Sequence, residues 1–545
     1  MRQLLFSSIL FLVAVAVSAQ AEAPAMAAGK RPRLIVLIAV DQLRADYLPR
    51  LREKFLPPYA GGGRVGGYRY LMERGAYYPN AQYGHLHCMT GPGHATMLTG
   101  AYPYQSGIPL NDWFDAETGK KTYCAEDAVH PQIGGGGGFS PRNLRVTTVG
   151  DEMKNAGLPS KVASIALKDR ASIFMGGFRA DASIWFDAKS FHWTSSTFYF
   201  PDGKLPAWVG EANSGIDGKK GKQFGWNPEL LKVGDSGWEG GKTDKANAHA
   251  SWTFGDKDSL AGPIGVELTI DLAEKAVTAL DLGKDTVPDL LAVSLSSHDY
   301  LAHDVGPNSK WINAMTLYED KQIARFLNTL RETIPGGLAS VAVVLTADHG
   351  IPPDPDWLAK NRVPAGRFDE VAVTAELEER LVKRFGKAPN GKWVAYGGEL
   401  NYSWEPKARA AEKPGVVLLE AEAKKFFVEK PFTAHVLGRT EIEQRRYPPE
   451  LLGKQVARTF VPGRSGDVIV IPKPFYIPGP ATVTHVTGYA YDRTVPIVFA
   501  GESFRSGTYG SAADVVDIAP TLAFLLGIVP PAGSEGRILD EAFKR

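Results

Sequence analysis

This sequence of 545 residues has little cysteine, no excess of charge of either sign and only one long apolar run. Its two cysteines, Cys88 and Cys124, are too few for a disulfide framework or for a metal site of four thiolates. Lys plus Arg number 61 and Asp plus Glu number 60, so the net charge of +1 creates no overall field to attract nucleic acid or a membrane surface. With 44% hydrophobic and 22% charged residues, the composition is typical of a folded globular chain.

The one long apolar run lies at the N-terminus. Met1, Arg2 and Gln3 precede it and small residues follow it, which is typical of a secretory signal peptide. We expect a signal peptide over residues 1–19, with cleavage after Ala19 or Ala21; an uncleaved N-terminal anchor is the alternative. Because the run is shorter than the roughly 20 residues of a spanning helix, the mature protein is expected to be exported, periplasmic or extracellular, with no stable membrane anchor.

Four short apolar runs are typical of buried strands in a parallel sheet. They are Leu34–Val40, Leu290–Ser296, Val341–Ala347 and Val495–Gly501. Amphipathic helical patterns lie between them, over residues 265–282 and 311–334. This alternation predicts an α/β fold with a doubly wound, mostly parallel central sheet flanked by helices.

Two stretches interrupt this alternation. Residues from about 171 to 262 are rich in Trp, Phe and Gly, and residues from about 351 to 480 combine Pro-rich loops with a helical pattern near Glu370–Phe385. We expect both stretches to be insertions that cap a single catalytic domain spanning residues 30–530.

Acidic and histidine side chains follow the predicted strands, at the sheet edge where α/β proteins bind ligands. They are Asp41, Asp299, His303, Asp348, His349 and His485. A strand-end Asp is often a helix cap, and a lone His is more often structural than a ligand. Three Asp and three His without cysteine nevertheless form a nitrogen and oxygen donor set that suits two Zn²⁺ ions better than Ca²⁺.

Thr90 lies in the segment HCMTGPGHATMLTG, where Pro92 predicts the first turn of a helix and places Thr90 just before it. Its hydroxyl has two interpretations. In the first, the hydroxyl caps the helix. In the second, a neighbouring Zn²⁺ lowers the pKa of the hydroxyl, which then acts as a nucleophile.

In their order and spacing these motifs resemble those of the alkaline phosphatase superfamily, and within it the phosphate-irrepressible, PafA-like alkaline phosphatases with a Thr nucleophile. The resemblance covers nearly the whole mature chain. The matching segments are AVDQLRADYL, TGPGHATMLTG, GIPLNDWFD, LKDR, HDYLAHDVGP, TADHG and THVTGYAYDRTVPIVFAG.

The resemblance implies two Zn²⁺ ions per subunit, about 4 Å apart as in two-metal phosphoryl-transfer sites. One ion would be held by Asp299, His303 and His485. The other would be held by Asp41, Asp348, His349 and the Thr90 oxygen. The implied activity is the hydrolysis of small-molecule phosphate monoesters through a phosphothreonine intermediate, with release of inorganic phosphate.

The resemblance also implies that Asn111, Lys168 and Arg170 bind the phosphoryl group. Cationic donors aimed at its non-bridging oxygens favour a monoester dianion over a diester, which has one of these oxygens esterified. A Lys-x-Arg pair by itself more often lies on the solvated surface. The position of this pair after the strand-like segment KVASIAL favours the binding role.

Three other functions are alternatives to phosphatase activity. Nucleotide pyrophosphatase/phosphodiesterases share the Thr segment, the Asn and the six metal ligands, but usually have Asn where Gly93 stands and lack the Lys-x-Arg pair. Sulfatases need a Cys-x-Pro-x-Arg context, which Cys88 does not have. An exported metal- or phosphate-binding protein would keep the site without turnover.

The state of the two cysteines, Cys88 and Cys124, is a separate question. One disulfide bridge between them is slightly favoured over two buried thiols.

Overall fold

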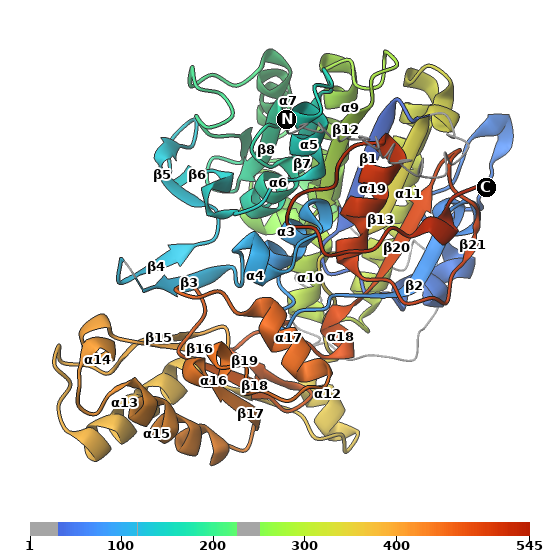
Figure 1. The fold of residues 1–545 in the computed structure, drawn as a ribbon. Coiled ribbons are helices and arrows are strands. Elements are labelled where there is room, and N and C mark those ends of the chain that lie inside the picture. The colour runs from blue at the N-terminus through green and yellow to red at the C-terminus, as the bar shows by residue number, and fades with distance from the viewer. Residues whose placement is uncertain (1–30, 117, 226–250, 545) are drawn as a thin grey trace, which may run out of the picture.

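The computed structural model describes residues 31–116, 118–225 and 251–544, so the expected signal peptide lies outside the described residues. A nine-stranded sheet forms the centre of the molecule (Figure 1). Its order is β21 (Gly507–Thr508), β2 (Ala76–Gln82), β20 (Thr494–Ala500), β13 (Val341–Thr346), β1 (Leu34–Val40), β12 (Asp289–Leu295), β7 (Val162–Ala166), β8 (Ala182–Asp187) and β9 (His192–Thr194).

The middle of this sheet is parallel, as its apolar sequences predict. Strands β1 and β12 are buried at every position, because helices cover both faces of the sheet. Strand β1 pairs in parallel with β12 and β13, and Ala39 lies opposite both Ser294 and Thr346. The three strands therefore end level with one another. The predicted doubly wound, mostly parallel α/β fold is confirmed.

The direction predicted for one strand is wrong. Strand β20 contains the run Val495–Gly501 except its last residue, and it pairs antiparallel with both β13 and β2. Burial on both faces makes a strand continuously apolar whatever its direction, so the run itself could not distinguish the two.

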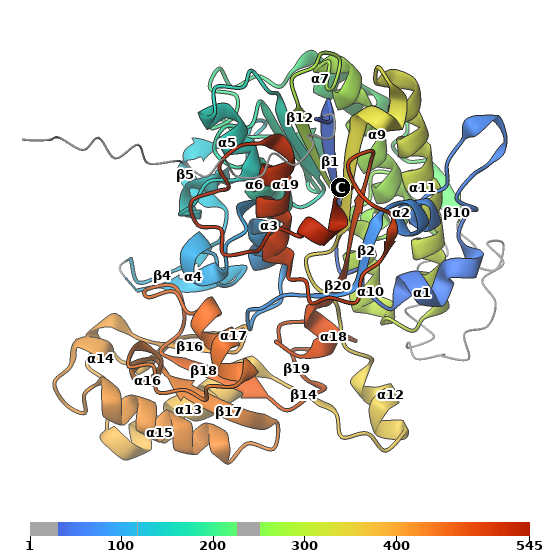
Figure 2. The same cartoon turned by 45° about the vertical axis from the view of Figure 1, so that its right-hand side comes forward.

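Helices form a layer on each face of the sheet, as Figure 2 shows. The predicted helices at residues 265–282 and 311–334 are confirmed as α9 (Pro263–Ala279) and α11 (Lys310–Thr333), which pack together on one face. The other layer contains α3 (Thr90–Thr99), α5 (Val149–Asn155), α6 (Asp169–Gly176) and α19 (Ile518–Leu526). None of the described helices is long and apolar enough to cross a membrane.

The first stretch that we expected to be an insertion, about residues 171–262, begins as part of the central sheet. Strand β8 pairs in parallel with β7, and β9 pairs with β8 at the sheet edge. Trp185 and Trp193 on these strands are 1% exposed, so the aromatic residues fill the interior. Helix α7 (Ala207–Asp217) then packs against β9 and α9.

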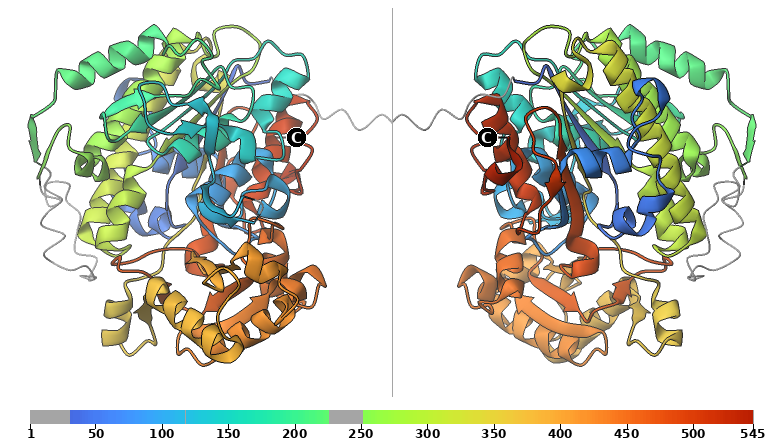
Figure 3. Two further views of the ribbon diagram at one scale, coloured as in Figure 1. Left: turned by 90° about the vertical axis from the view of Figure 1, so that its left-hand side faces the viewer. Right: turned by 90° about the vertical axis from the view of Figure 1, so that its right-hand side faces the viewer.

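The second stretch, about residues 351–480, contains a separate four-stranded sheet and forms a lobe beside one end of the central sheet (Figures 1 and 3). Its strands are β15 (Val394–Gly398), β16 (Asn401–Trp404), β18 (Val468–Pro472) and β17 (Thr433–Gly438). Helices α13 (Glu370–Phe385), which confirms the predicted helix, and α15 (Val416–Val428) pack on this sheet. Where the chain enters and leaves the lobe, β14 (Gly366–Phe368) pairs with β19 (Tyr476–Pro478).

Candidate active site

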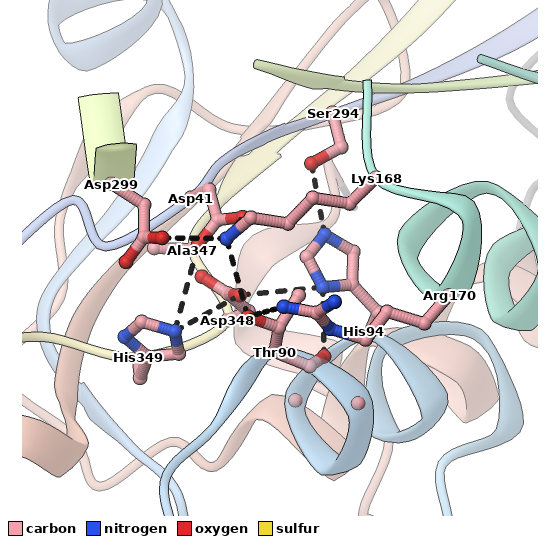
Figure 4. A network of polar contacts seen from close by, with 12 residues as sticks. Asp41, Thr90, His94, Lys168, Arg170, Ser294, Asp299, Ala347, Asp348 and His349 are labelled. Atoms are coloured by element: carbon pink, nitrogen blue, oxygen red, sulfur yellow. Dashed lines mark hydrogen bonds and ion pairs between the residues drawn. The ribbon is translucent and has the colours of Figure 1, made fainter. Parts of the chain in front are cut away.

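Three buried aspartates meet where the parallel strands end. Asp41 directly follows β1, Asp299 lies in α10 (Ser297–Val305) just after β12, and Asp348 lies two residues beyond β13. Each is at most 3% exposed. The aligned register of the three strands brings these carboxylates together, as Figure 4 shows.

One cluster of polar atoms is left without hydrogen bonds. His349 Nε2 lies 3.2 Å from Asp348 Oδ2 and 3.5 Å from Asp41 Oδ1. All three atoms are buried, and none of them takes part in a hydrogen bond with the described residues. Buried polar groups are rarely left unpaired, so these converging atoms fit a bound cation.

A second cluster lies beside the first and contains Asp299, His303 and His485. The Nε2 atoms of the two histidines lie 3.2 and 3.6 Å from Asp299 Oδ1. Their Nδ1 atoms face the main-chain carbonyls of Val483 and Cys88, at 2.9 and 2.8 Å. A carbonyl at Nδ1 fixes the tautomer that leaves Nε2 free to coordinate a metal.

The electrostatics also favour a divalent cation here. Burial, and after it the neighbouring Asp348, raises the pKa of Asp41 to about 7. Burial lowers the pKa of His485 to about 3, so this imidazole is neutral and can act as a ligand. Asp299 lies within reach of both clusters, because it also groups with Asp41 and His349. The nitrogen and oxygen donors, without thiolate, fit Zn²⁺.

Thr90 is the first residue of α3, one position later relative to the helix than we expected. Met89 occupies the N-cap position and no side chain caps this helix, so the capping interpretation of the Thr90 hydroxyl does not apply. Instead Thr90 Oγ1 lies 3.3 Å from both Lys168 Nζ and Arg170 Nη2 (Figure 4). A buried hydroxyl is thus placed between two cations at a helix N-terminus.

Lys168 and Arg170 belong to the interior of the site and not to a solvated surface. Lys168 Nζ lies 2.6 Å from Asp41 Oδ2 and 2.6 Å from Asp299 Oδ2. Burial opposes its charge, but Asp299 and Asp41 raise the pKa of Lys168 overall. Arg170 is half-buried and donates from Nη1 to the Tyr123 hydroxyl over 3.2 Å. Both side chains therefore keep their charge and a fixed position.

Asn111 completes the group of predicted residues. Its Oδ1 accepts a hydrogen bond of 2.7 Å from the main-chain N–H of Gly91, which follows Thr90. A cavity of about 290 Å³ opens over the site. Its lining includes Thr90, Asn111, Arg170, Asp299, His303 and His485, together with Glu370 and Glu399 from the lobe.

Several residues at this site were not predicted from the sequence. Gln42 is fully buried, and it donates from its main-chain nitrogen to Asp348 Oδ1 (2.9 Å) and from Nε2 to Asp299 Oδ1 (2.5 Å). His94 Nε2 lies 2.9 Å from Ser294 Oγ, and His94 Nδ1 lies 3.3 Å from Asp348 Oδ2. The one sequence feature that could have pointed to Gln42 is its position next to Asp41.

The slightly favoured disulfide bridge is wrong. Cys88 and Cys124 are both free and buried, and burial raises the pKa of each thiol well above its usual range. Protonated, inaccessible thiols of this kind act as small apolar side chains.

Comparison with known proteins identifies relatives over nearly the whole chain. Residues 35–478 match the family described as type I phosphodiesterase / nucleotide pyrophosphatase. The alkaline phosphatase PafA of Elizabethkingia meningoseptica is 31% identical over 544 residues, covering 94% of this chain and 95% of that protein. A protein named calcium-transporting ATPase, from Myroides odoratus, is 32% identical over 540 residues, with 95% of both chains covered. Three further relatives, 30–33% identical, are named alkaline phosphatases.

The fold agrees with a solved structure of the same kind. The crystal structure of wild-type alkaline phosphatase PafA superimposes with a TM-score of 0.84 at 28% identity, covering 94% of this chain and 99% of that chain.

Proposed function

This chain belongs to the type I phosphodiesterase / nucleotide pyrophosphatase family and is a phosphatase-type hydrolase, and from that premise we propose that it is a zinc-dependent alkaline phosphatase acting on phosphate monoesters. The observation that carries the proposal is the position of Thr90 Oγ1, 3.3 Å from both Lys168 Nζ and Arg170 Nη2. A nucleophile with two cations beside it matches the charge that a phosphoryl dianion brings to the reaction.

Two Zn²⁺ sites are supported by the donor clusters described above. One would be formed by Asp299, His303 and His485. The other would be formed by Asp41, Asp348, His349 and the Thr90 oxygen. Bound Zn²⁺ lowers the pKa of a hydroxyl it contacts and withdraws negative charge from a departing oxygen.

In the proposed reaction, Thr90 Oγ1 attacks phosphorus as the bond to the leaving-group oxygen breaks, which gives a phosphothreonine and a free alcohol or phenol. Water then attacks the same phosphorus, the bond to Thr90 breaks, and inorganic phosphate leaves. Arg170 and Asn111 would hold the non-bridging oxygens, and Lys168 would supply a positive charge beside them. Two in-line displacements give net retention of configuration at phosphorus.

Gly93 and the cationic side chains of Lys168 and Arg170 favour a monoesterase over a nucleotide pyrophosphatase/phosphodiesterase. A Cβ atom at Gly93 would lie 2.4 Å from the main-chain oxygen of Asp348, so the Asn that is usual there in those enzymes would need the backbone to shift. Lys168 and Arg170 would meet an esterified, uncharged oxygen in a diester. Small phosphate monoesters are therefore the proposed substrates, in the exported compartment that the N-terminal sequence predicts.

The proposal is tested by measuring kcat/KM of the zinc-loaded protein on p-nitrophenyl phosphate and bis-p-nitrophenyl phosphate side by side at about pH 9, with a chelator-treated sample as control. We expect monoester hydrolysis to be faster by orders of magnitude and to disappear on chelation. Preference for the diester would make the protein a phosphodiesterase, and zinc binding without turnover of either substrate would make it a binding protein.

A further inference from the structure

The lobe contacts the catalytic cavity through a tight turn of unusual sequence. Strands β15 and β16 pair with Gly398 opposite Asn401, so only Glu399 and Leu400 join them. Both residues have positive φ, +50° and +64°. Two-residue hairpin turns with two positive φ angles strongly favour Asn-Gly, because other side chains are strained there. The sequence of this turn is therefore not the one that hairpin stability alone would select.

Neighbouring groups hold the turn in this conformation. The Glu370 carboxylate accepts hydrogen bonds from the main-chain nitrogens of Glu399 (3.2 Å) and Leu400 (2.8 Å). Asn401 Nδ2 donates to the Glu399 carbonyl over 2.8 Å, and the Leu400 side chain is buried. Left-handed non-glycine residues persist where the surroundings fix them, and they cluster at functional sites.

The Glu399 side chain is not needed for this clamp. It lines the cavity that also contains Thr90, Asn111 and Arg170, and its Oε2 lies 3.4 Å from the main-chain nitrogen of Asp112. Within the part of the chain that the structure describes, Glu399 forms no ion pair. The strained turn thus places an acidic side chain, which has no ion-pair partner among the described residues, in the same cavity as Arg170 and the proposed phosphoryl site.

Resting on the proposed monoesterase activity, we propose that Glu399 is a specificity-determining residue that selects the leaving group of the phosphate ester by charge. An ionised carboxylate beside the phosphoryl site repels a leaving group that carries its own carboxylate or a further phosphate. It attracts a leaving group with an ammonium group or a hydroxyl donor. The preferred substrates are then aminoalkyl or hydroxyalkyl phosphates, and the same phosphoryl group on an anionic leaving group is disfavoured.

A matched pair of substrates tests this selection. Phosphoethanolamine and phosphoglycolate have the same phosphoryl group and similar size, but their leaving groups carry an ammonium and a carboxylate, respectively. We expect the zinc-loaded full chain at pH 9 to prefer phosphoethanolamine in kcat/KM by at least about tenfold. In Glu399→Gln and Glu399→Asn most of that preference should disappear, while kcat/KM on p-nitrophenyl phosphate changes much less.

Glu399→Asn is included as a control for misfolding, because Asn tolerates the left-handed conformation that this turn requires. Glu379→Gln, at an exposed position on α13, is the matched control and should keep the wild-type ratio. A ratio that stays the same in both Glu399 variants would overturn the inference while leaving the phosphatase intact. Failure of the wild type to hydrolyse p-nitrophenyl phosphate would instead refute the proposed function, and this inference with it.

Discussion

The Gln42 side chain donates from Nε2 to Asp299 Oδ1 over 2.5 Å, while its own main-chain nitrogen donates to Asp348 over 2.9 Å. One buried residue therefore ties together carboxylates from the two proposed zinc sites. Its φ of +69° is a left-handed conformation that non-glycine residues rarely adopt. A residue in such a strained conformation persists only where the groups around it hold it in place.

Gln42→Met should therefore weaken zinc retention, because it removes the amide and keeps a side chain of similar length. Loss of such a partner typically lowers metal affinity by about 10- to 100-fold. Zinc content after timed dialysis against a chelator measures the effect independently of turnover. Gln444→Met, at an exposed position, is the control. Wild-type zinc retention in Gln42→Met would show that Asp299 needs no such support.

Thr90→Ala should lower kcat on p-nitrophenyl phosphate by at least about 10³-fold while zinc content and the circular dichroism spectrum stay unchanged. The hydroxyl is the proposed nucleophile, and Thr90→Ser should keep part of the activity because it keeps that hydroxyl. Thr96→Ala is a matched control in the same helix, since the Thr96 hydroxyl donates back to the Pro92 carbonyl. Turnover near wild type in Thr90→Ala would refute the nucleophile assignment.

Arg170→Ala should reduce kcat/KM for a monoester by about 10²- to 10³-fold and for a diester by much less. The guanidinium lies 3.3 Å from Thr90 Oγ1, and a monoester dianion brings more negative charge to it than a diester, which has one oxygen esterified. The two p-nitrophenyl substrates measure both losses on one enzyme preparation. Lys154→Ala, which removes a partly exposed ion pair with Asp181, controls for loss of a cation. Equal losses on both substrates would contradict the assignment of Arg170 to monoester recognition.

The preference for phosphoethanolamine over phosphoglycolate should depend on pH. Burial, and then Asp112, raises the pKa of Glu399 to about 8. The charged groups that act on it are Asp112, Glu370 and Arg170, with Tyr396 also nearby. Since a raised carboxyl pKa keeps the proton on below that pH, the preference should be full above pH 8 and decline as the pH falls through it.

The ratio of the two kcat/KM values, measured from pH 6.5 to pH 9.5, tests this dependence. Taking the ratio cancels effects of pH on the common phosphoryl chemistry. In Glu399→Asn the ratio should be flat over this range, because Asn does not ionise. A wild-type ratio without an inflection would show that the Glu399 carboxyl does not set the discrimination.

The sequence predicted the parts of the site that depend on strand ends. Asp41, Asp299 and Asp348 follow β1, β12 and β13, and parallel strands in register must bring such residues to one edge. Apolar runs of seven residues, bounded by polar residues, are enough to locate such strands. The direction of β20 was not predicted, because burial on both faces removes the alternation that would mark an exposed side.

The contribution of the lobe to the cavity could not be predicted from the sequence. Glu399 is more than 280 residues from Asp112 and is placed by a turn whose conformation its own sequence disfavours. Gln42 likewise reaches Asp299 across 257 positions, a contact that only the packed structure defines. Local patterns predict elements and their ends, whereas these contacts depend on how side chains that are distant in the sequence pack together.

Strands β14 and β19 hold the entrance and the exit of the lobe side by side, with Gly366 opposite Tyr476. A segment whose two ends are already neighbours changes length at little cost in loop-closure entropy, and it does not shift the strands outside it. The lobe is therefore able to differ in length between related chains while β13 and β20, which flank it in the sequence, stay paired. The leaving-group selectivity that we propose for Glu399 can then differ from one relative to another, while the aspartates at the ends of β1, β12 and β13, which lie outside the lobe, stay the same.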